Sequence, residues 1–571
     1  MISTAARPRW GLPSLLLAAT SLAAAGCRQS PKPVATQHND ASGTGANVPV
    51  ATQHNDVRRT GAYLTERVLT PDNVKGSGMR LRARRPLDGN STSQPLYIPN
   101  VTINGRQHNV VYLLTVSNSV YAYDADDRDK LWPTQGPLWV TRLPSIKDAT
   151  RPNALHSWTQ GTPVIDVPTQ TMYLVYGVDN GAWPNQGLGD GAYDAAFHIA
   201  ALDIRTGKVL RDSVVHAEVP SEASPGVVAF APQRQVQRPG LLLTPDLGVR
   251  GPKSVYIAFA TRYLEEAVNY HGWVLRYDAA TLRLLSAFCT TPDQRNVGDG
   301  GGVWQGGGGL AADDSGSVYF LTGNGPAGRN SFGNSIVKLT PTTGPTPGTY
   351  GFAVTAFSAA ADDSAHQDEW SRYDLDLGAG GPVLVPKSST LIGGGKTGVY
   401  YVMDYSAGLM KVQSFTAFTN VYAPTDRYTS WDRGPHLHGA PVYWPFSDDS
   451  GFVYGWAEKD SLRRFTYHYS TGRLDELHPL SAHVVADDSV MPGGNISLSA
   501  NGTRDGILWA TQPHHRSDTG HLIAFDALSL RELWRTSIPV PGHFVPPTIA
   551  DGKVFVVTAN RMLLIYDLPE P

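Results

Sequence analysis

Imidazole, indole and amide side chains recur at equivalent places in this 571-residue chain, a few residues before short apolar strands. They are His156, Trp158 and Gln160, then Trp304 and Gln305, then His436 and His438, and finally His543. Aromatic faces with imidazole and amide groups suit a planar or sugar-like ligand, because they offer both stacking and directional hydrogen bonds. The same side chains could instead fill a crowded channel and satisfy its backbone groups. We therefore treat them as ligand-binding candidates and keep this structural interpretation beside the functional one.

A metal site would need a third ligand beside the motif His436-Leu437-His438. An extended segment places the two imidazoles on one face, and Asp432 is close in the sequence. A single His-x-His with no third ligand in register is more typical of a polar channel lining, so we predict no metal site. The acidic stretches 313–316 and 448–451 lack the further oxygen ligands of a calcium loop and are expected to be hairpin turns. These motifs leave the catalytic residues, if any, unknown.

The element that must position these residues is a repeated alternating strand that ends in Asp or Thr. Its eight copies span residues 120–124, 199–203, 273–278, 336–340, 399–404, 462–466, 522–526 and 563–567. A pair of strands stands ahead of each copy, and several copies are followed by a tight turn and another strand. Eight units of about four antiparallel strands are typical of an all-β, eight-bladed β-propeller. The loops before the first strands of such blades gather at one end of the central channel.

Closure of the ring can be predicted from the end of the last repeat. The eighth unit stops at Asp567 and lacks room for its outermost strand. The stretch from about 79 to 87 stands at the same distance before the first unit as the outer strand of the seventh unit stands before the eighth, so it can supply that strand. We expect this N-terminal strand to close the last blade, because it joins the two termini and protects an open sheet edge.

The N-terminal region is typical of an exported protein. Residues 1–26 combine Arg7 and Arg9, a short apolar stretch, and small residues before Cys27, which resembles a bacterial lipoprotein signal peptide with Cys27 as the lipidation site. An ordinary signal peptide with a chance cysteine is the alternative. Residues 27–50 are expected to be a flexible tether carrying one copy of a duplicated Ala-Thr-Gln-His-Asn-Asp segment, and 51–571 to be the propeller.

The composition limits the partners and the location. Forty-seven Lys and Arg against 50 Asp and Glu give a formal charge of -3, which provides no bulk field for nucleic acid. No later run of 18 apolar residues exists, so contact with a membrane is expected through the lipid anchor alone. Cys289 is the only other cysteine, which leaves no internal disulfide after Cys27 is acylated. We expect a monomer anchored to the cell envelope, facing the periplasm or the exterior.

Over residues 51–571 the chain resembles the pyrroloquinoline quinone (PQQ)-type β-propeller repeat proteins, the superfamily of quinoprotein alcohol dehydrogenases and their non-enzymatic relatives. More narrowly, it resembles a bacterial secreted group of that superfamily without established activity. The stretches that carry the likeness are Gln53–Asp56, Arg59–Ala62, Leu69–Val74, Gln237–Leu243, His271–Leu275, Gly302–Gln305, Leu321–Gly325, His438–Trp444 and Met491–Ser499.

The resemblance implies two competing functions. The enzymes of the superfamily pack a disulfide between adjacent cysteines on PQQ and hold calcium beside it, whereas this chain has no adjacent cysteines and no Cys-x-x-Cys-His haem motif. We therefore expect a non-enzymatic binding or assembly platform, for an envelope protein or a small polar ligand at the channel mouth. The alternative is a PQQ-dependent oxidoreductase of alcohols or sugars that uses the Trp/His-lined mouth, with PQQ and calcium as cofactors.

Overall fold

The computed structural model describes the greater part of residues 48–570. The described ranges are 48–126, 136–144, 159–179, 195–223, 226–261, 269–295, 298, 300–360, 364–419, 434–485, 491–514 and 518–570. The chain divides into two compact units, residues 1–36 and 37–571, and the described residues all belong to the second. The expected signal peptide, Cys27 and the tether up to residue 47 lie outside them. Among the described residues, no helix is long and apolar enough to span a membrane.

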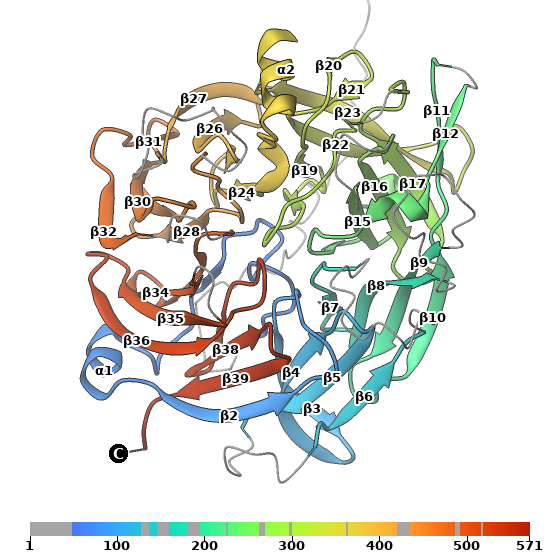
Figure 1. Ribbon diagram of the computed structural model, residues 1–571. Helices are drawn as coiled ribbons and strands as arrows, with labels where there is room; N and C mark the ends of the chain where they lie inside the picture. The colour runs from blue at the N-terminus through green and yellow to red at the C-terminus, as the bar shows by residue number, and fades with distance from the viewer. Residues whose placement is uncertain are drawn as a thin grey trace, which may run out of the picture. The chain divides into compact units, whose positions relative to one another are not determined.

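The described strands form eight antiparallel sheets placed as blades around a ring, which confirms the predicted fold (Figure 1). Blade 1 consists of β3 (Leu96–Ile103), β4 (Arg106–Leu114), β5 (Ser119–Asp124) and β6 (Trp139–Arg142), and blade 2 of β7 (Val164–Asp166), β8 (Thr171–Asp179), β9 (Ala195–Asp203) and β10 (Val209–Val214). Blade 3 consists of β14 (Leu242–Thr244), β15 (Ser254–Thr261), β16 (Trp273–Asp278) and β17 (Leu284–Cys289). Blade 4 consists of β18 (Ala311–Ala312), β19 (Val318–Leu321), β22 (Ser335–Thr343) and β23 (Tyr350–Ala359).

The second half of the ring repeats this order. Blade 5 consists of β24 (Val383–Leu384), β25 (Thr390–Gly394), β26 (Val399–Asp404) and β27 (Met410–Thr416), and blade 6 of β28 (Val442–Pro445), β29 (Ser450–Gly455), β30 (Ser461–His468) and β32 (Leu480–Val485). Blade 7 consists of β33 (Asn495–Asn501), β34 (Arg504–Pro513), β35 (Thr519–Asp526) and β36 (Glu532–Pro539). Blade 8 consists of β37 (Thr548–Ala550), β38 (Lys553–Thr558), β39 (Met562–Asp567) and β2 (Arg80–Pro86). The repeated strand of the sequence is the third strand of every blade.

Smaller elements decorate the blades. They are β1 (Ala62–Tyr63), β13 (Gln235–Val236) and β31 (Arg473–Leu474) at sheet edges, the hairpins β11 (Glu218–Pro220) with β12 (Val227–Ala229) and β20 (Ala327–Gly328) with β21 (Ser331–Phe332), and the helices α1 (Pro71–Ser77) and α2 (Ser364–Arg372). The two acidic stretches of the sequence are the turns between β18 and β19 and between β28 and β29, as expected.

The aspartate that ends the repeated strand has a local role. In blade 3, Asp278 accepts hydrogen bonds through Oδ1 from the backbone N–H groups of Ala280 (2.8 Å) and Thr281 (2.9 Å). Asp526 of blade 7 accepts one from the N–H of Ser529 at 2.7 Å. A short side chain that bonds backbone groups two or three residues further on stabilises the tight turn into the fourth strand. This explains why the repeat is visible in the sequence.

The N-terminal strand closes the last blade, as the sequence predicts. β2 pairs antiparallel with β39, with Arg80 opposite Asp567 and Pro86 opposite Met562. Arg82 adds an ion pair, because its Nη1 lies 2.9 Å from Asp567 Oδ2. Figure 1 shows β2 in blue beside β39 in red, so a strand from the N-terminal part of the chain and the last strand lie in one sheet.

The apolar core lies between neighbouring blades. Eight clusters of buried side chains fill the contacts between successive described blades, including the contact between blades 8 and 1. In the cluster between blades 2 and 3, Phe197 packs edge-on against Phe259 with ring centroids 5.1 Å apart, and the free thiol of Cys289 is buried there. Each blade therefore depends on both neighbours to bury its faces, which makes ring closure a requirement for stability.

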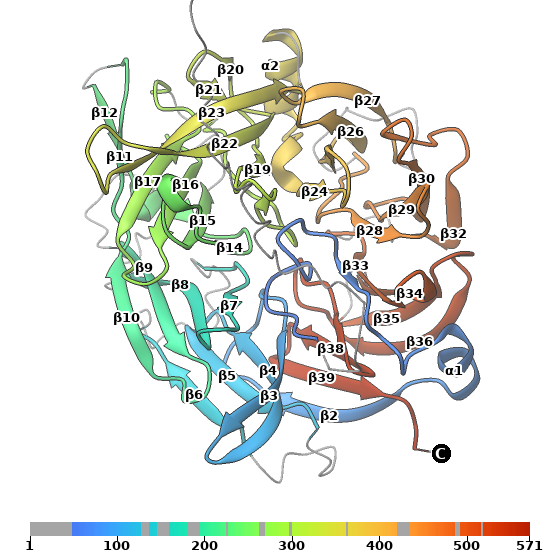
Figure 2. The same ribbon diagram turned by 180° about the vertical axis from the view of Figure 1, so that it is seen from behind.

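Residues 50–63, here called the channel segment, occupy the centre of the ring (Figure 2). Their backbone bonds the inner strands of six blades through the pairs Val50–Tyr97, Ala51–Ile165, Val57–Ala312, Arg58–Leu384, Thr60–Tyr443 and Gly61–Leu498. The side chain of Arg59 adds a contact with blade 3 by donating a hydrogen bond to the carbonyl oxygen of Leu241 at 2.9 Å. The channel is therefore filled by the chain itself, and a ligand can reach only its ends.

Candidate functional site

The first strands of the blades begin at one end of the channel, here called the mouth. In an antiparallel blade, the segment before the first strand and the turn between the second and third strands lie at the same end. Parallel bridges join these segments between neighbouring blades, at Thr159–Gln237, Gly240–Gly309 and Gly380–Gly439. Side chains that are far apart in the sequence thus meet at the mouth.

A cation between aromatic rings forms the centre of the mouth. The guanidinium carbon of Arg238 lies 4.3 Å from the ring centroid of Phe544 and 5.4 Å from that of Trp304. Its Nε donates a hydrogen bond to Gln160 Oε1 at 3.1 Å, and His543 stacks on Phe544 with centroids 3.9 Å apart. These five residues, called the mouth cluster below, come from blades 2, 3, 4 and 8.

The mouth cluster presents polar and aromatic groups to the outside. Phe544 is buried, Gln160, Arg238 and Trp304 are half-buried, and His543 is exposed. Two cavities of about 10 Å³ each lie at this level, one lined by Gln160, Arg238 and Phe544 and one by His438. Each has room for about one water molecule, so the described part of the mouth has a closed floor. A ligand would rest on the cluster rather than enter the channel.

The structure divides the sequence candidates into three groups. His156 and Trp158 lie outside the described residues. Gln160, Trp304 and His543 come together in the mouth cluster. Gln305, His436 and His438 are buried, at 0%, 6% and 6% exposure, so none of them is a direct contact for a ligand on the surface. Both polar atoms of the Gln305 side-chain amide lack a hydrogen-bond partner among the described residues.

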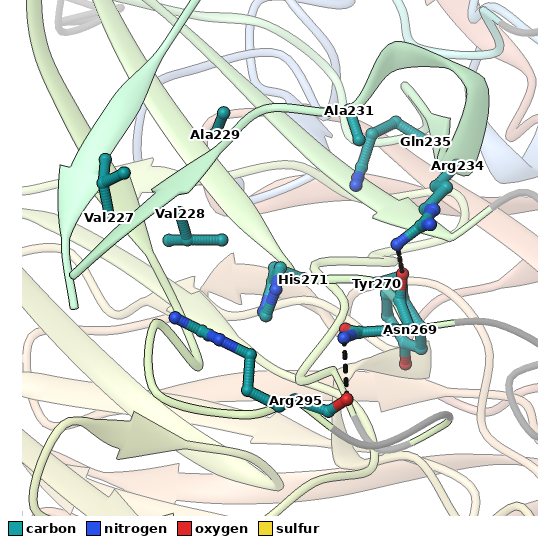
Figure 3. Close-up of a pocket in the computed structure, with 10 residues that line it drawn as sticks. All are labelled: Val227, Val228, Ala229, Ala231, Arg234, Gln235, Asn269, Tyr270, His271 and Arg295. Carbon is teal, nitrogen blue, oxygen red and sulfur yellow. Dashed lines mark hydrogen bonds between the residues drawn. The ribbon is translucent and has the colours of Figure 1, made fainter. Parts of the chain in front are cut away.

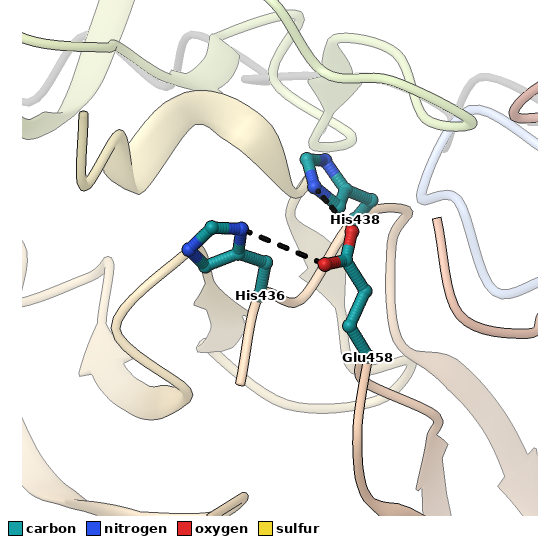
Figure 4. A group of neighbouring side chains, drawn as sticks. All are labelled: His436, His438 and Glu458. Carbon is teal, nitrogen blue, oxygen red and sulfur yellow. Dashed lines mark ion pairs between the residues drawn. The ribbon is translucent and has the colours of Figure 1, made fainter. Parts of the chain in front are cut away.

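His436 and His438 share a buried carboxylate that sequence reasoning missed. His436 Nδ1 lies 3.6 Å from Glu458 Oε2, and His438 Nε2 lies 3.1 Å from Glu458 Oε1 (Figure 4). Burial lowers the pKa of His436 to about 3 and that of His438 well below its usual value, whereas burial raises the pKa of Glu458 to about 7. Asp432, the acidic neighbour considered from the sequence, lies outside the described residues.

A second polar network lies where blades 4 and 5 meet the mouth. Lys396 Nζ is 2.7 Å from Asp374 Oδ2 and 2.7 Å from Asp376 Oδ2. Asn324 donates to Asp376 from its backbone N–H at 2.9 Å and to Asp374 from its side chain at 3.2 Å. Burial and the neighbouring charge of Asp376 raise the pKa of Asp374 to about 7. The Asp374 side chain is 44% exposed, so this carboxyl, with its raised pKa, is accessible to a molecule at the mouth.

A larger cavity lies beside blade 3 and shares no lining residue with the mouth cluster (Figure 3). It measures about 180 Å³ and is lined by β12, Arg234, Asn269, His271 and Arg295. Its two arginines hold loops together, because Arg234 Nη1 donates to the Asn269 carbonyl at 2.7 Å and Arg295 Nη1 to the Pro292 carbonyl at 2.7 Å. The volume is below the 300–1,000 Å³ or so of typical ligand pockets. We place the candidate site at the mouth because Gln160, Trp304 and His543 meet there around Arg238, and not on grounds of cavity volume.

Only the comparison with solved structures finds similar proteins, and it shows the fold alone. No family model matches the chain, and no curated protein matches it. Among solved structures it is similar to the quinohemoprotein alcohol dehydrogenase ADHIIG from Pseudomonas putida, with 14% identity and a TM-score of 0.54 over 92% of this chain and 82% of that one. A europium-containing methanol dehydrogenase has 14% identity and a TM-score of 0.56 over 91% and 98%.

A third solved structure is similar to this chain to the same degree. The quinohemoprotein alcohol dehydrogenase from Comamonas testosteroni has 13% identity and a TM-score of 0.54 over 92% of this chain and 82% of that one. The likeness confirms that this chain has the quinoprotein alcohol dehydrogenase-like propeller fold. At this level of identity the fold is shared, and the function has to be argued from the site.

The described residues do not fit the calcium ion that the resemblance implies beside PQQ. Calcium takes about six to eight oxygen ligands. The acidic pair at the mouth, Asp374 and Asp376, holds the ammonium of Lys396 where a cation would bind. The group of His436, His438 and Glu458 offers two nitrogen donors and one carboxylate, which is not a calcium donor set. The stacked cation of the mouth cluster would suit any planar anion, PQQ among them.

Proposed function

We propose that this protein is an exported, monomeric propeller that binds a ligand on its mouth cluster and serves as a binding or assembly platform. The observation that carries the proposal is Arg238 held between Trp304 and Phe544, with part of its surface exposed. The expected occupant is an anionic group with a flat face, from a small polar ligand or from a segment of an envelope protein.

The cluster is preorganised for such a ligand. Stacking on two rings and the hydrogen bond to Gln160 restrict the guanidinium to one orientation before any ligand binds. An arginine positioned in this way binds a carboxylate through parallel hydrogen bonds, and the neighbouring Trp304 and His543 offer faces for stacking. Less conformational entropy is lost on binding because these side chains are already ordered.

Calorimetric titration tests the proposal with two probes, PQQ without calcium as a planar tricarboxylate and a peptide of aromatic and acidic residues. We expect R238Q to weaken probe binding by about 10-fold or more, the loss of one charged hydrogen-bonding group. R205Q is the matched control, because Arg205 is an exposed arginine in the turn after β9, at the opposite end of its blade. Equal binding by R238Q and R205Q, or no binding of either probe, would contradict the proposal.

The alternative function is a PQQ-dependent oxidoreductase, favoured by one observation. Asp374, whose pKa is raised to about 7, could take a proton from an alcohol hydroxyl at the mouth. The unsuitable calcium donor set argues against this function. Reconstitution with PQQ and calcium, followed by dye-linked assays on alcohols and sugars, separates the two. Turnover that D374N abolishes would establish the oxidoreductase and overturn the platform.

We also propose that the protein is anchored to the cell envelope through a lipid on Cys27. The small residues before Cys27 and the absence of any later apolar run of 18 residues in the sequence support this proposal. C27A should move the protein from the membrane fraction to the soluble fraction of fractionated cells. Membrane retention that is unchanged in C27A would refute lipid anchoring.

A further inference from the structure

Two imidazoles and one carboxylate converge in the interior of blade 6, beneath the mouth. The candidate ligand atoms of His436, His438 and Glu458 all lie within 4.8 Å of one another, and each residue is 6% exposed (Figure 4). We propose that these residues form a binding site for a divalent transition-metal ion, with Zn²⁺ as the best match. This site adjoins the mouth cluster, because His438 packs against Phe544 with ring centroids 5.2 Å apart, but it shares no residue with the cluster and does not depend on the proposed function.

The spacing of the donors suits a zinc ion. Zn²⁺ binds histidine nitrogen and carboxylate oxygen at about 2.0–2.2 Å, which puts tetrahedral ligand atoms about 3.4 Å apart. The two contacts of the Glu458 carboxylate, 3.1 Å to His438 Nε2 and 3.6 Å to His436 Nδ1, lie on either side of that value. Small side-chain rotations would bring the donors to a common centre.

Two of the donor atoms are buried without a hydrogen-bond partner. Among the described residues, His438 Nε2 and Glu458 Oε1 have no hydrogen-bond partner although they are only 3.1 Å apart, whereas His436 faces Glu458 through Nδ1 and its unpartnered Nε2 lies on the far side of the ring. Buried polar groups in native proteins are nearly always paired, and an isolated buried carboxylate is costly. A metal ion bound by His436 Nδ1, His438 Nε2 and the Glu458 carboxylate would pair the two unpartnered atoms that face each other, His438 Nε2 and Glu458 Oε1.

The local fold holds the three donors in place. Because side chains alternate along an extended segment, His436 and His438 share one side while Leu437 enters the core between blades 5 and 6. The backbone N–H of Glu458, in the turn between β29 and β30, donates to the His436 carbonyl oxygen at 3.0 Å. The carboxylate is thereby fixed to the segment that carries the imidazoles.

The surrounding charges permit a cation. Three cations act on the imidazoles: Lys396 on both, Lys459 on His436 and Arg238 on His438. The charge of Lys396 is offset by Asp374 and Asp376, each 2.7 Å from its Nζ, and Glu458 supplies the negative charge that the metal ion would meet. Two imidazoles and one carboxylate are borderline donors that favour Zn²⁺ and its neighbours over calcium or magnesium. Three protein ligands leave a coordination position open, and the cavity of about 10 Å³ beside His438 can hold about one water.

Metal binding by the full chain tests this inference. After chelator treatment and dialysis, calorimetric titration with Zn²⁺ should show one tight site per chain, and Co²⁺ should give the strong visible absorption of a four-coordinate ion. E458Q keeps the shape of the side chain but removes the carboxylate, and it should weaken binding of both ions by about 100-fold or more. Loss of a residue that only hydrogen-bonds to a metal ligand typically weakens binding by about 10- to 100-fold, and loss of a ligand should cost more. H438Q is the second variant, in case one of them fails to fold.

The exposed imidazole pair of blade 7 provides the matched control. His514 Nε2 lies 2.8 Å from His521 Nδ1, so this pair could bind added metal at the surface. H521Q should leave the tight site and the Co²⁺ spectrum unchanged. The inference is overturned if wild type binds no Zn²⁺, or if E458Q and H438Q, folded as judged by circular dichroism, bind it as tightly as wild type. Loss of the site in H521Q would assign it to the surface pair and would equally overturn the inference.

Discussion

Replacement of Arg59 by methionine tests whether the channel segment holds the ring together. Arg59 is fully buried and donates four hydrogen bonds, to the carbonyl oxygens of Gln53 (2.8 Å), Leu241 (2.9 Å) and Leu310 (2.8 Å) and to Thr52 Oγ1 (2.7 Å). Leu241 and Leu310 directly precede the first strands of blades 3 and 4. One guanidinium thus links the channel segment to two blades.

The expected loss of stability follows from these contacts. At about 1.5 kcal/mol for a hydrogen bond from a charged donor, four bonds amount to about 6 kcal/mol. Burial opposes them, since it lowers the pKa of Arg59 from 12.5 to about 10, which corresponds to roughly 3 kcal/mol against the charged form. R59M should therefore lower the free energy of unfolding by about 3 kcal/mol. With about 2.1 cal/mol/K of unfolding entropy per residue over roughly 520 residues, the Tm should fall by about 3 °C.

Differential scanning calorimetry measures this shift, and hydrogen exchange locates it. Exchange of backbone amides in residues 50–63 should accelerate in R59M, since their partners lie on the inner strands. R205M is the control, because Arg205 forms a solvent-exposed pair with Asp203, and such pairs contribute little to stability. A Tm decrease in R59M no larger than in R205M, with unchanged exchange in residues 50–63, would refute the reasoning.

Two further predictions concern the mouth and the closure. K396M should cost about 3–5 kcal/mol at neutral pH, because it leaves the buried carboxylate of Asp376 without its cation. Lys396 lowers the pKa of Asp376 in the wild type, so loss of Lys396 raises that pKa. The loss of stability in K396M should therefore shrink as the pH falls from 7.5 to 4.5 and the Asp376 carboxyl becomes protonated. A loss of stability that stays constant in thermal melts over this pH range would contradict the prediction. Deletion through Leu87 should expose the edge of β39 and cause aggregation in light scattering, whereas deletion of residues 28–47 should leave the protein monodisperse. Equal scattering by both truncations would remove the argument for closure.

The blade architecture could be read from the sequence because its cause is local. Strands of alternating polarity, an aspartate that stabilises the next turn, and a regular spacing all act within a few tens of residues. Asp278 and Asp526 show this directly, since each bonds the backbone of its own turn. Counting strands was enough to predict that the last blade lacked one, and a sheet edge next to Asp567 had to be covered by another part of the chain.

The candidate site depended on contacts that the sequence does not display. Trp304, Gln160 and His543 could be selected because they precede the same strand in different blades, but Arg238 gains its role only from the rings of Trp304 and Phe544 around it. Glu458 stands in a turn between the second and third strands of its blade. Such turns lie at the same end as the segments before the first strands, and this rule would have pointed to it.

The role of the channel segment was decided by the tertiary structure alone. The sequence places Arg59 at the start of the propeller, where an arginine is ordinarily an exposed residue. Its partners Leu241 and Leu310 lie 182 and 251 residues away, and only ring closure brings their carbonyl oxygens to the centre of the channel. Local patterns therefore determined the blades, whereas the filled channel and the chemistry at its mouth arise from bringing eight distant segments to one axis.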